Sequence, residues 1–423
     1  GIGNEDEGDE EDPDMRILDN GIKIGDEEEP LIWDIECSFT STDTWVRWCG
    51  ANGFYCFDGA GFTDNLDIDY LFESSDPTNI LSNYSDNGTE VDGCGIFFIN
   101  PHEEECDANP DPYTVIEIID TNVEENTWDG IRFKDNEATV NIHRNEVHEN
   151  AERGIYFDFA CLSGLVHIYN NYVWNNGWEG IATFKGNNQY VAIYIRGNLV
   201  ESNAFVGEAN LRADANWLAN WQRCANIRIH GQFGSSEIIP GDDWGLLEQE
   251  WTMICNNTII DGITGMSIED LSEAEGENAM DPRWVSVHNN IQYGAQEDGL
   301  RLEDYWNGEG DVPGVLIYNN NFCNNGSDGI WISARVPGED DDDFGAKIKN
   351  NILFNNTDDG IDNDSDDQDV VFSHNGFDDN GTNMEGCLAF EPILMDPLLV
   401  DAVDDLDGVD FHLRWDSPMI NRG

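Results

Sequence analysis

The chain has 423 residues and a formal net charge of −68, because 87 acidic residues stand against 19 lysines and arginines. This charge argues against nucleic acid as a partner, since phosphate binding requires a basic surface. A hydrophobic content of 39% and 14 tryptophans argue against disorder, and no apolar run is long enough to span a membrane.

The first third of the chain predicts a tail followed by a cap. Residues 1–14 form an acidic, low-complexity stretch that we expect to be a flexible tail. Residues 15–113 are rich in aromatic side chains, glycine and cysteine, with entering strands expected at 17–24 and 31–35. We interpret them as an N-terminal cap with the first irregular coils, because a stack of strands needs a covered end.

Residues 114–390 contain a repeat in which short alternating apolar segments lead to an asparagine. A second asparagine follows five residues later, and a glycine four residues after that, as in residues 315–330. The repeat recurs at intervals of about 26 to 31 residues, which is typical of stacked units. Its first asparagines are Asn145, Asn171, Asn198, Asn257, Asn290, Asn320, Asn351 and Asn375.

The apolar spacing of two residues predicts strands, so each repeat is one coil of short strands stacked on the next. The fold class is therefore all-β, a right-handed parallel β-helix with a rise of roughly 4.8 Å per coil. Asparagine suits a corner because it tolerates positive φ and can bond the amide of the next coil. Glycine is expected to permit the other corner.

The repeat is interrupted by two insertions and is followed by a C-terminal segment. Loop insertions are predicted near 208–250 and 270–281, where the repeat breaks down. Residues 391–423 are interpreted as a C-terminal capping segment with a strand at 410–413.

Over residues 115–380 the repeat resembles the pectate-lyase-like superfamily of parallel β-helix proteins. That superfamily includes polysaccharide lyases, hydrolases, epimerases, adhesins and inert surface proteins, so the resemblance implies a fold rather than one activity. In its enzymes, the strand after the glycine carries the active site. Here the corresponding candidates, if the protein is an enzyme, are Arg132, Lys134, Asp158, Lys185 and Arg212.

These residue types fit a polysaccharide lyase, which needs a base and a cation that stabilises the developing charge. The alternative is that they form ion pairs between coils. Aromatic side chains at neighbouring positions are candidates for binding sugar faces, with packing beneath an insertion as the alternative. They are Trp128, Tyr156, Trp178 and Phe205.

A column of acidic residues before the repeated glycine, and an acidic run after it, predict calcium as a cofactor, because stacked carboxylates repel one another without a cation. An ordinary Asp-Gly turn is the alternative. The candidate ligands are Asp298, Asp328, Asp359, Asp362, Asp364 and Asp366.

The ten cysteines are scattered singly, which favours disulfides in an oxidising compartment over a zinc site; buried thiols are the alternative. Asn-x-Ser/Thr sequences mark candidate glycosylation sites. They are Asn83, Asn87, Asn256, Asn325, Asn355, Asn363 and Asn380.

Two functions fit these features. The first is a secreted or cell-surface structural or adhesive protein that self-associates into filaments, with calcium and glycan contacts. The second is a polysaccharide lyase, epimerase or glycoside hydrolase acting along the face of the coils. The regular repeat and the extreme charge favour the first, whereas the basic and aromatic positions favour the second.

Overall fold

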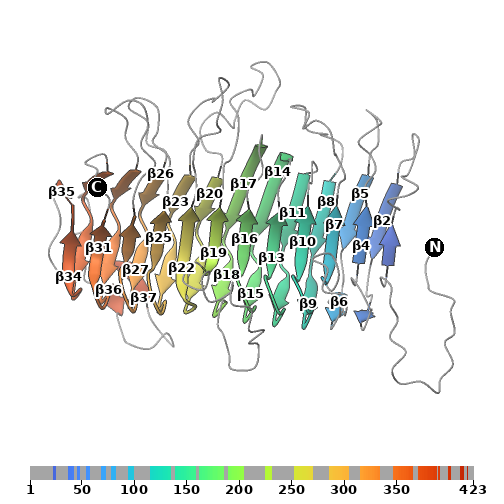
Figure 1. Ribbon diagram of the computed structural model, residues 1–423, viewed down its shortest axis with the longest axis horizontal. Coiled ribbons are helices and arrows are strands. Elements are labelled where there is room, and N and C mark those ends of the chain that lie inside the picture. The colour runs from blue at the N-terminus through green and yellow to red at the C-terminus, as the bar shows by residue number, and fades with distance from the viewer. Residues whose placement is uncertain are drawn as a thin grey trace, which may run out of the picture. The chain divides into compact units, whose positions relative to one another are not determined.

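The structure is a computed structural model. It describes side chains in residues 94–98, 116–134, 140–158, 165–184, 193–203, 224–230, 252–269, 285–303, 315–333, 346–364, 370–387 and 417, and the backbone of further strands. The chain divides into two compact units, residues 1–192 with 203–212 and residues 193–202 with 213–423. Each is built from parallel strands in three sheets, named A, B and C (Figure 1).

In the first unit, the chain passes repeatedly from sheet B to sheet C to sheet A. Sheet A contains β1 (Ile22–Ile24), β4 (Phe54–Phe57), β7 (Ile96–Ile99), β10 (Ile131–Lys134), β13 (Ile155–Asp158) and β16 (Ile181–Phe184). Sheet B contains β2 (Cys37–Ser41), β5 (Ile68–Phe72), β8 (Val115–Ile119), β11 (Thr139–His143) and β14 (Leu162–Tyr169). Sheet C contains β3 (Trp45–Arg47), β6 (Thr78–Leu81), β9 (Thr121–Glu124), β12 (Glu146–His148) and β15 (Tyr172–Trp174).

The second unit repeats this order. Sheet A contains β19 (Ala225–His230), β22 (Thr264–Glu269), β25 (Leu300–Glu303), β28 (Ile330–Ile332), β31 (Asp359–Asn363) and β34 (Thr382–Glu385). Sheet B contains β17 (Gln189–Arg196), which enters the unit at residue 193, β20 (Thr252–Cys255), β23 (Val285–His288), β26 (Val315–Tyr318), β29 (Ala346–Lys349), β32 (Val370–Ser373) and β35 (Ala389–Phe390). Sheet C contains β18 (Leu199–Glu201), β21 (Thr258–Ile260), β24 (Ile291–Tyr293), β27 (Asn321–Cys323), β30 (Ile352–Phe354) and β33 (Gly376–Asp378).

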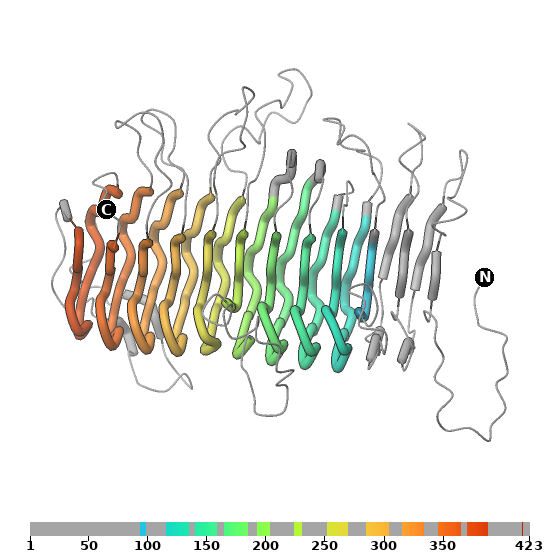
Figure 2. The backbone as a smooth tube through the Cα atoms, in the orientation of Figure 1, coloured from blue at the N-terminus to red at the C-terminus, as the bar shows by residue number. Residues whose placement is uncertain are grey.

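This topology confirms the predicted right-handed parallel β-helix, and the backbone trace shows the same coil repeated within each unit (Figure 2). The predicted strand at 410–413 is also present, as β37 (Asp410–Leu413), and it pairs antiparallel with β36 (Leu399–Asp401). The tail at 1–14, the predicted strand at 31–35 and the insertion at 270–281 lie outside the described residues, as does most of 208–250.

The core lies inside the coils, where alternate side chains of each strand meet those of the next coil. Phe133 is fully buried and stacks between Phe98 and Phe157, with ring centroids 5.0 and 4.8 Å away. A period of two residues therefore leaves every second side chain of sheet A on the outer face.

The predicted asparagine ladder is confirmed. The Nδ2 of Asn145 donates to Oδ1 of Asn171, and in the second unit the Nδ2 of Asn320 donates to Oδ1 of Asn351, both at 3.0 Å. The same Oδ1 also accepts the backbone N–H of the preceding ladder residue. A second ladder includes the pair Asn325 and Asn356, joined at 2.8 Å.

The expected reason for the corner residues was wrong. Ladder asparagines are not the residues with positive φ; the residue before each of them is, as with Arg144 at 58° and Asn319 at 57°. Ladder positions therefore select asparagine for its amide bonds, whereas the preceding residue turns the chain.

The repeated glycines were also expected to permit a corner, and this too was wrong. Gly329 is not among the described glycines with positive φ. Instead, a Cβ at Gly329 would lie 2.6 Å from the carbonyl oxygen of Gly360 and 2.8 Å from Nδ2 of Asn356. Glycine is required there because the backbones of successive coils approach closely.

We expect Gly329→Ala to lower the free energy of unfolding by about 1–3 kcal/mol, since the added methyl group meets backbone that cannot move aside. Gly197→Asn is the matched control, because Gly197 has a φ of 64° at a corner where other coils carry asparagine. Chemical denaturation measures both. Equal losses for the two variants would contradict the close-approach explanation.

The prediction of disulfides is wrong for two of the cysteines. Cys323 and Cys387 are thiols, and burial raises the pKa of each to about 12. The alternative of buried thiols applies to Cys323, which packs inside its coil.

Candidate active site

Sheet A of the first unit brings several of the predicted residues together. Arg132 of β10 is in register with Tyr156 of β13, and Lys134 is in register with Asp158. Because Ile131 and Phe133 fill the core, the side chains between and after them lie on the outer face.

The turns that lead into sheet A add a second row of side chains. The backbone N–H of Glu152 donates to the carbonyl of Trp128 at 3.2 Å, and the N–H of Trp178 donates to the carbonyl of Glu152 at 2.8 Å. Glu152 therefore occupies the position between two tryptophans on successive coils. Its side chain is 17% exposed, so solvent reaches it although most of its surface is buried.

Arg153 joins the two rows. Its Nε donates to Oε2 of Glu179 at 2.9 Å, and its Nη1 lies 3.6 Å from carboxylate oxygens of both Asp129 and Glu152. The same guanidinium lies over the ring of Tyr156, 4.1 Å from its centroid. This buried group fixes the acidic side chains around it through charge and geometry together.

Arg132 makes a parallel arrangement one coil earlier. Its Nη2 donates to Oδ2 of Asp158 at 2.7 Å, and its Nη1 lies 3.7 Å from Asp129. Its guanidinium is 5.2 Å from the centroid of the Tyr156 ring. The alternative of ion pairs between coils is therefore correct for Arg132 and Asp158.

Burial raises the pKa of Glu152 to about 8, and the charge of Asp129 adds to this rise against the opposing effect of Arg153. Burial also raises the pKa of Asp129 and of Tyr156. Burial therefore shifts the Glu152 carboxyl group towards its protonated form.

The other predicted residues are placed as follows. Trp128 packs on Cys94 and Phe97, as the packing alternative proposed. Tyr156 is 6% exposed between two guanidinium groups, so its ring offers no open face to a sugar. Trp178 is half-buried beside Arg153, and Lys185, Phe205 and Arg212 lie outside the described residues.

Sequence reasoning missed Glu152, Arg153, Asp129 and Glu179 as members of the site. A signal for Arg153 was present, because it is a basic residue in an otherwise acidic column before the repeated glycine. No pattern in the sequence indicated how far Glu152 would be desolvated.

In the second unit, the carboxylates of the acidic column accept hydrogen bonds from the backbone of the next coil. Asp298 accepts the N–H of Asp328 at 3.3 Å, and Asp328 accepts the N–H of Asp359 at 2.7 Å. Arg301 pairs with Asp298 at 2.8 Å. These carboxylates thus join successive coils through hydrogen bonds, and those bonds form without a metal ion. Asp362 lies in β31, the strand that begins at Asp359, and Asp364 directly follows the end of that strand. Asp366 lies outside the described residues.

This column predicts a pH-dependent stability. Burial raises the pKa of Asp328 to about 7, with Asp298 adding to the rise, and raises that of Asp362 to about 6. Unfolded aspartate titrates near a pKa of about 3.9. The folded state therefore holds these protons more tightly, so the contribution to stability is fully present below about pH 4 and is lost as the pH rises through about 7.

We expect the melting temperature to fall between pH 5 and pH 8 at constant ionic strength, and to fall less in Asp328→Asn, which has no proton to lose. Thermal melts of both proteins measure this difference. A variant with the same pH dependence as the wild type would contradict the assignment to Asp328.

The candidate glycosylation sites differ in access. Asn325 is buried and its Nδ2 donates to Asn356, and Asn363 is also buried, so neither offers its amide to an enzyme in the folded chain. Asn256 is exposed. Asn355 and Asn380 are partly buried, and Asn83 and Asn87 lie outside the described residues.

Among the residues that the structure describes, no helix is long and apolar enough to cross a membrane.

No family model matches the chain, and no curated protein matches it. Among solved structures, the A-module of the Azotobacter vinelandii mannuronan C-5 epimerase AlgE6 aligns with a TM-score of 0.43 and 11% identity, over 86% of this chain and 91% of that one. The catalytic unit of a GH87 α-1,3-glucanase from Streptomyces thermodiastaticus aligns at 0.46 and 10%, over 85% and 62%. A mutant of the periplasmic alginate epimerase AlgG aligns at 0.44 and 10%, over 81% and 62%. The chain's own three parallel sheets identify it as a parallel β-helix protein.

Proposed function

We propose that the protein is an enzyme that cleaves glycosidic bonds in a polysaccharide lying across sheet A of the first unit, with Glu152 as the proton donor. The observation that carries this proposal is the placement of Glu152, whose backbone lies between those of Trp128 and Trp178 and whose carboxyl group lies 3.6 Å from Nη1 of the buried Arg153. A carboxylic acid that is protonated at neutral pH and open to solvent on one side is the group that glycosidic cleavage requires.

Cleavage needs a proton on the leaving oxygen as the carbon–oxygen bond breaks. Glu152 supplies that proton, and its own carboxylate is then stabilised by Arg153 at 3.6 Å. In hydrolysis, water adds to the sugar carbon and its second proton returns to a carboxylate. In elimination, a base removes the proton beside a uronate carboxylate. The same acid therefore serves both reactions.

The remaining groups favour binding of a sugar chain. The half-buried ring of Trp178 lies along the site, where it can pack against a sugar. Lys134 makes no ion pair within the described residues, unlike Arg132 and Arg153, so its charge is available to a carboxylate of the substrate. Asp158 is 31% exposed and held by Arg132, which positions it as the second carboxylate.

In a coil with a purely structural role, a buried acid such as Glu152 would not add to stability. Desolvating an acid until it binds its proton at neutral pH lowers stability, and perturbed groups of this kind cluster at functional sites. The site therefore favours the enzymatic interpretation over the structural and adhesive one that the sequence alone favoured. An extracellular setting, where counter-ions screen the net charge of −68, remains part of the proposal.

We also propose calcium as a cation held by the second unit. Burial is the main cause of the raised pKa values of Asp328 and Asp362, and the neighbouring carboxylates add to both rises. A cation would relieve that repulsion, and oxygen-rich groups of this kind suit calcium. Calcium added at pH 8 is then expected to raise the melting temperature of the wild type more than that of Asp328→Asn. An equal rise in both proteins would remove calcium from this column.

The test of the activity is incubation with alginate, pectate, chondroitin and neutral glucans. New reducing ends measure any cleavage, and absorbance of an unsaturated uronate separates elimination from hydrolysis. Cleavage that is lost in Glu152→Gln supports the proposal. Cleavage that persists at the same rate in that variant would refute the role of Glu152.

A further inference from the structure

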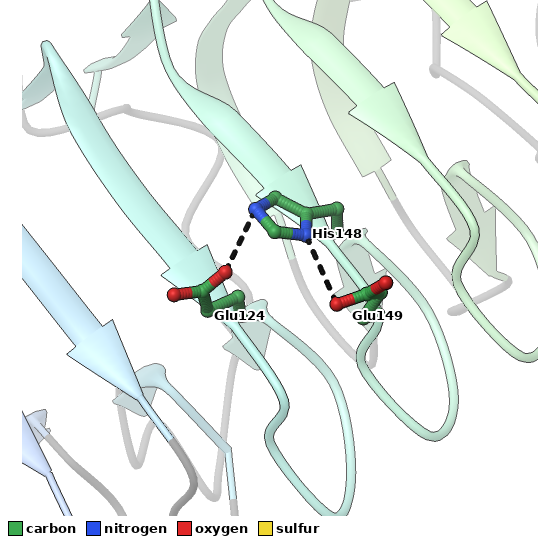
Figure 3. A group of neighbouring side chains, drawn as sticks. All are labelled: Glu124, His148 and Glu149. Atoms are coloured by element: carbon green, nitrogen blue, oxygen red, sulfur yellow. Dashed lines mark ion pairs between the residues drawn. The ribbon is translucent and has the colours of Figure 1, made fainter.

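Three side chains at the ends of neighbouring sheet C strands of the first unit lie together (Figure 3). The candidate active site lies on a different sheet, sheet A. Glu124 ends β9, His148 ends β12, and Glu149 follows His148 in the turn. Register places Glu124 and His148 side by side on neighbouring coils. Their candidate ligand atoms all lie within 4.8 Å of one another.

The partners of Nε2 assign the proton of the neutral His148 ring. Nε2 lies 3.0 Å from Oε2 of Glu124 and 3.1 Å from Oδ1 of Asn122. An ionised carboxylate only accepts hydrogen bonds, so Nε2 must carry the hydrogen and donate it. In the neutral imidazole this leaves a lone pair on Nδ1, on the side of the ring that faces Glu149 (Figure 3).

The Nδ1 atom is buried and has no hydrogen-bond partner, and the side chain of His148 is 8% exposed. Its nearest carboxylate oxygen, Oε2 of Glu149, is 3.7 Å away, which is too long for a hydrogen bond. A lone pair and a carboxylate facing one another repel unless the ring takes up a second proton or a cation lies between them. Two metal bonds of about 2.1 Å at a tetrahedral angle separate their ligand atoms by roughly 3.4 Å, close to the spacing seen here.

We infer that His148 Nδ1 and the Glu149 carboxylate bind a divalent transition-metal ion such as Zn²⁺, with Glu124 holding the imidazole in the required tautomer. A carboxylate that accepts the other ring N–H is the usual partner of a metal-binding histidine. Glu149 is 48% exposed, which leaves room for water ligands on the open side. The inference is independent of the proposed polysaccharide chemistry.

His143 provides an internal comparison. It too is largely buried, its Nε2 lies 3.0 Å from a glutamate of the preceding coil, Glu117, and its ring stacks on Tyr169 of the next coil at 4.5 Å. His148 stacks on Trp174 at 4.2 Å in the same way. The difference is Glu149, which places a second carboxylate beside the other ring nitrogen of His148.

The test is calorimetric titration of the full chain with Zn²⁺ in excess Mg²⁺, which occupies sites made of carboxylates alone. We expect one site that is lost in His148→Gln and is about 10- to 100-fold weaker in Glu124→Gln. Glu149→Gln changes an exposed side chain, so it tests the ligand without risk to folding. The matched controls His143→Gln and Glu146→Gln are expected to bind as the wild type does.

A second readout uses the stacked indole. Cu²⁺ bound at His148 is expected to quench the fluorescence of Trp174, and Trp174→Phe should remove that part of the quenching while Zn²⁺ still binds. Unchanged Zn²⁺ affinity in both His148→Gln and Glu149→Gln would overturn the inference. Absence of Zn²⁺ binding in the wild type would also overturn it, leaving a protonated His148 between two carboxylates.

Discussion

Glu152→Gln is expected to reduce polysaccharide cleavage by about 10²- to 10⁴-fold, because glutamine keeps the size of the side chain but has no proton to donate. The rate of the wild type is expected to fall as the pH rises through about 8, where Glu152 loses its proton. The direction of this pH dependence follows from the role of Glu152 as a proton donor. Its protonated form is the active one, so activity is retained below this pKa and lost above it.

The measurement is a pH–rate profile for the wild type, with Glu146→Gln as the control. Glu146 is an exposed glutamate on β12 of the same coil, so its loss should leave both the rate and the profile unchanged. A wild-type rate that rises through pH 8 would show that Glu152 acts as a base, contrary to the proposed role.

Asn320→Gly is expected to lower the free energy of unfolding by about 2–5 kcal/mol. The substitution removes the Oδ1 that accepts two bonds from Asn290, and the Nδ2 that donates to Val287 and Asn351. All these groups are buried, so several are left without partners where water cannot replace them.

The neighbouring Asn319→Gly is the matched control. Asn319 is exposed and has a φ of 57°, a conformation that glycine adopts without strain, so this variant should be nearly neutral. Denaturant titration of the two variants compares the same substitution at adjacent positions. If both variants lost the same free energy of unfolding, the distinction between Asn320, which bonds the neighbouring coils, and Asn319, which turns the chain, would be contradicted.

The fold was predictable because the sequence repeats the same pattern of apolar residues and asparagines once per coil. The repeated asparagines and the apolar alternation determine strands, coils and the stacked amides, and the structure confirms each of these. The physical reasons were predicted less well. Whether Asn319 or Asn320 takes the positive φ, and why Gly329 has no side chain, depend on distances between coils that a single sequence does not contain.

The candidate site was predictable only in part, for the same reason. Alignment of the repeats places Arg132, Lys134 and Asp158 on one face, where the structure has them. The raised pKa of Glu152 arises from its burial, and its carboxyl group is held beside Arg153 of the same turn. Both features depend on how the coils pack. The pairing of His148 with Glu124 joins two coils and likewise has no local sequence signal.

The most direct test of the central claim is a crystal structure of Glu152→Gln with an oligosaccharide of whichever polysaccharide the wild type cleaves. The account predicts a sugar chain across sheet A of the first unit, with a glycosidic oxygen within hydrogen-bond reach of residue 152 and a ring packed on Trp178. An oligosaccharide bound on another sheet, with residue 152 remote from every glycosidic oxygen, would contradict it.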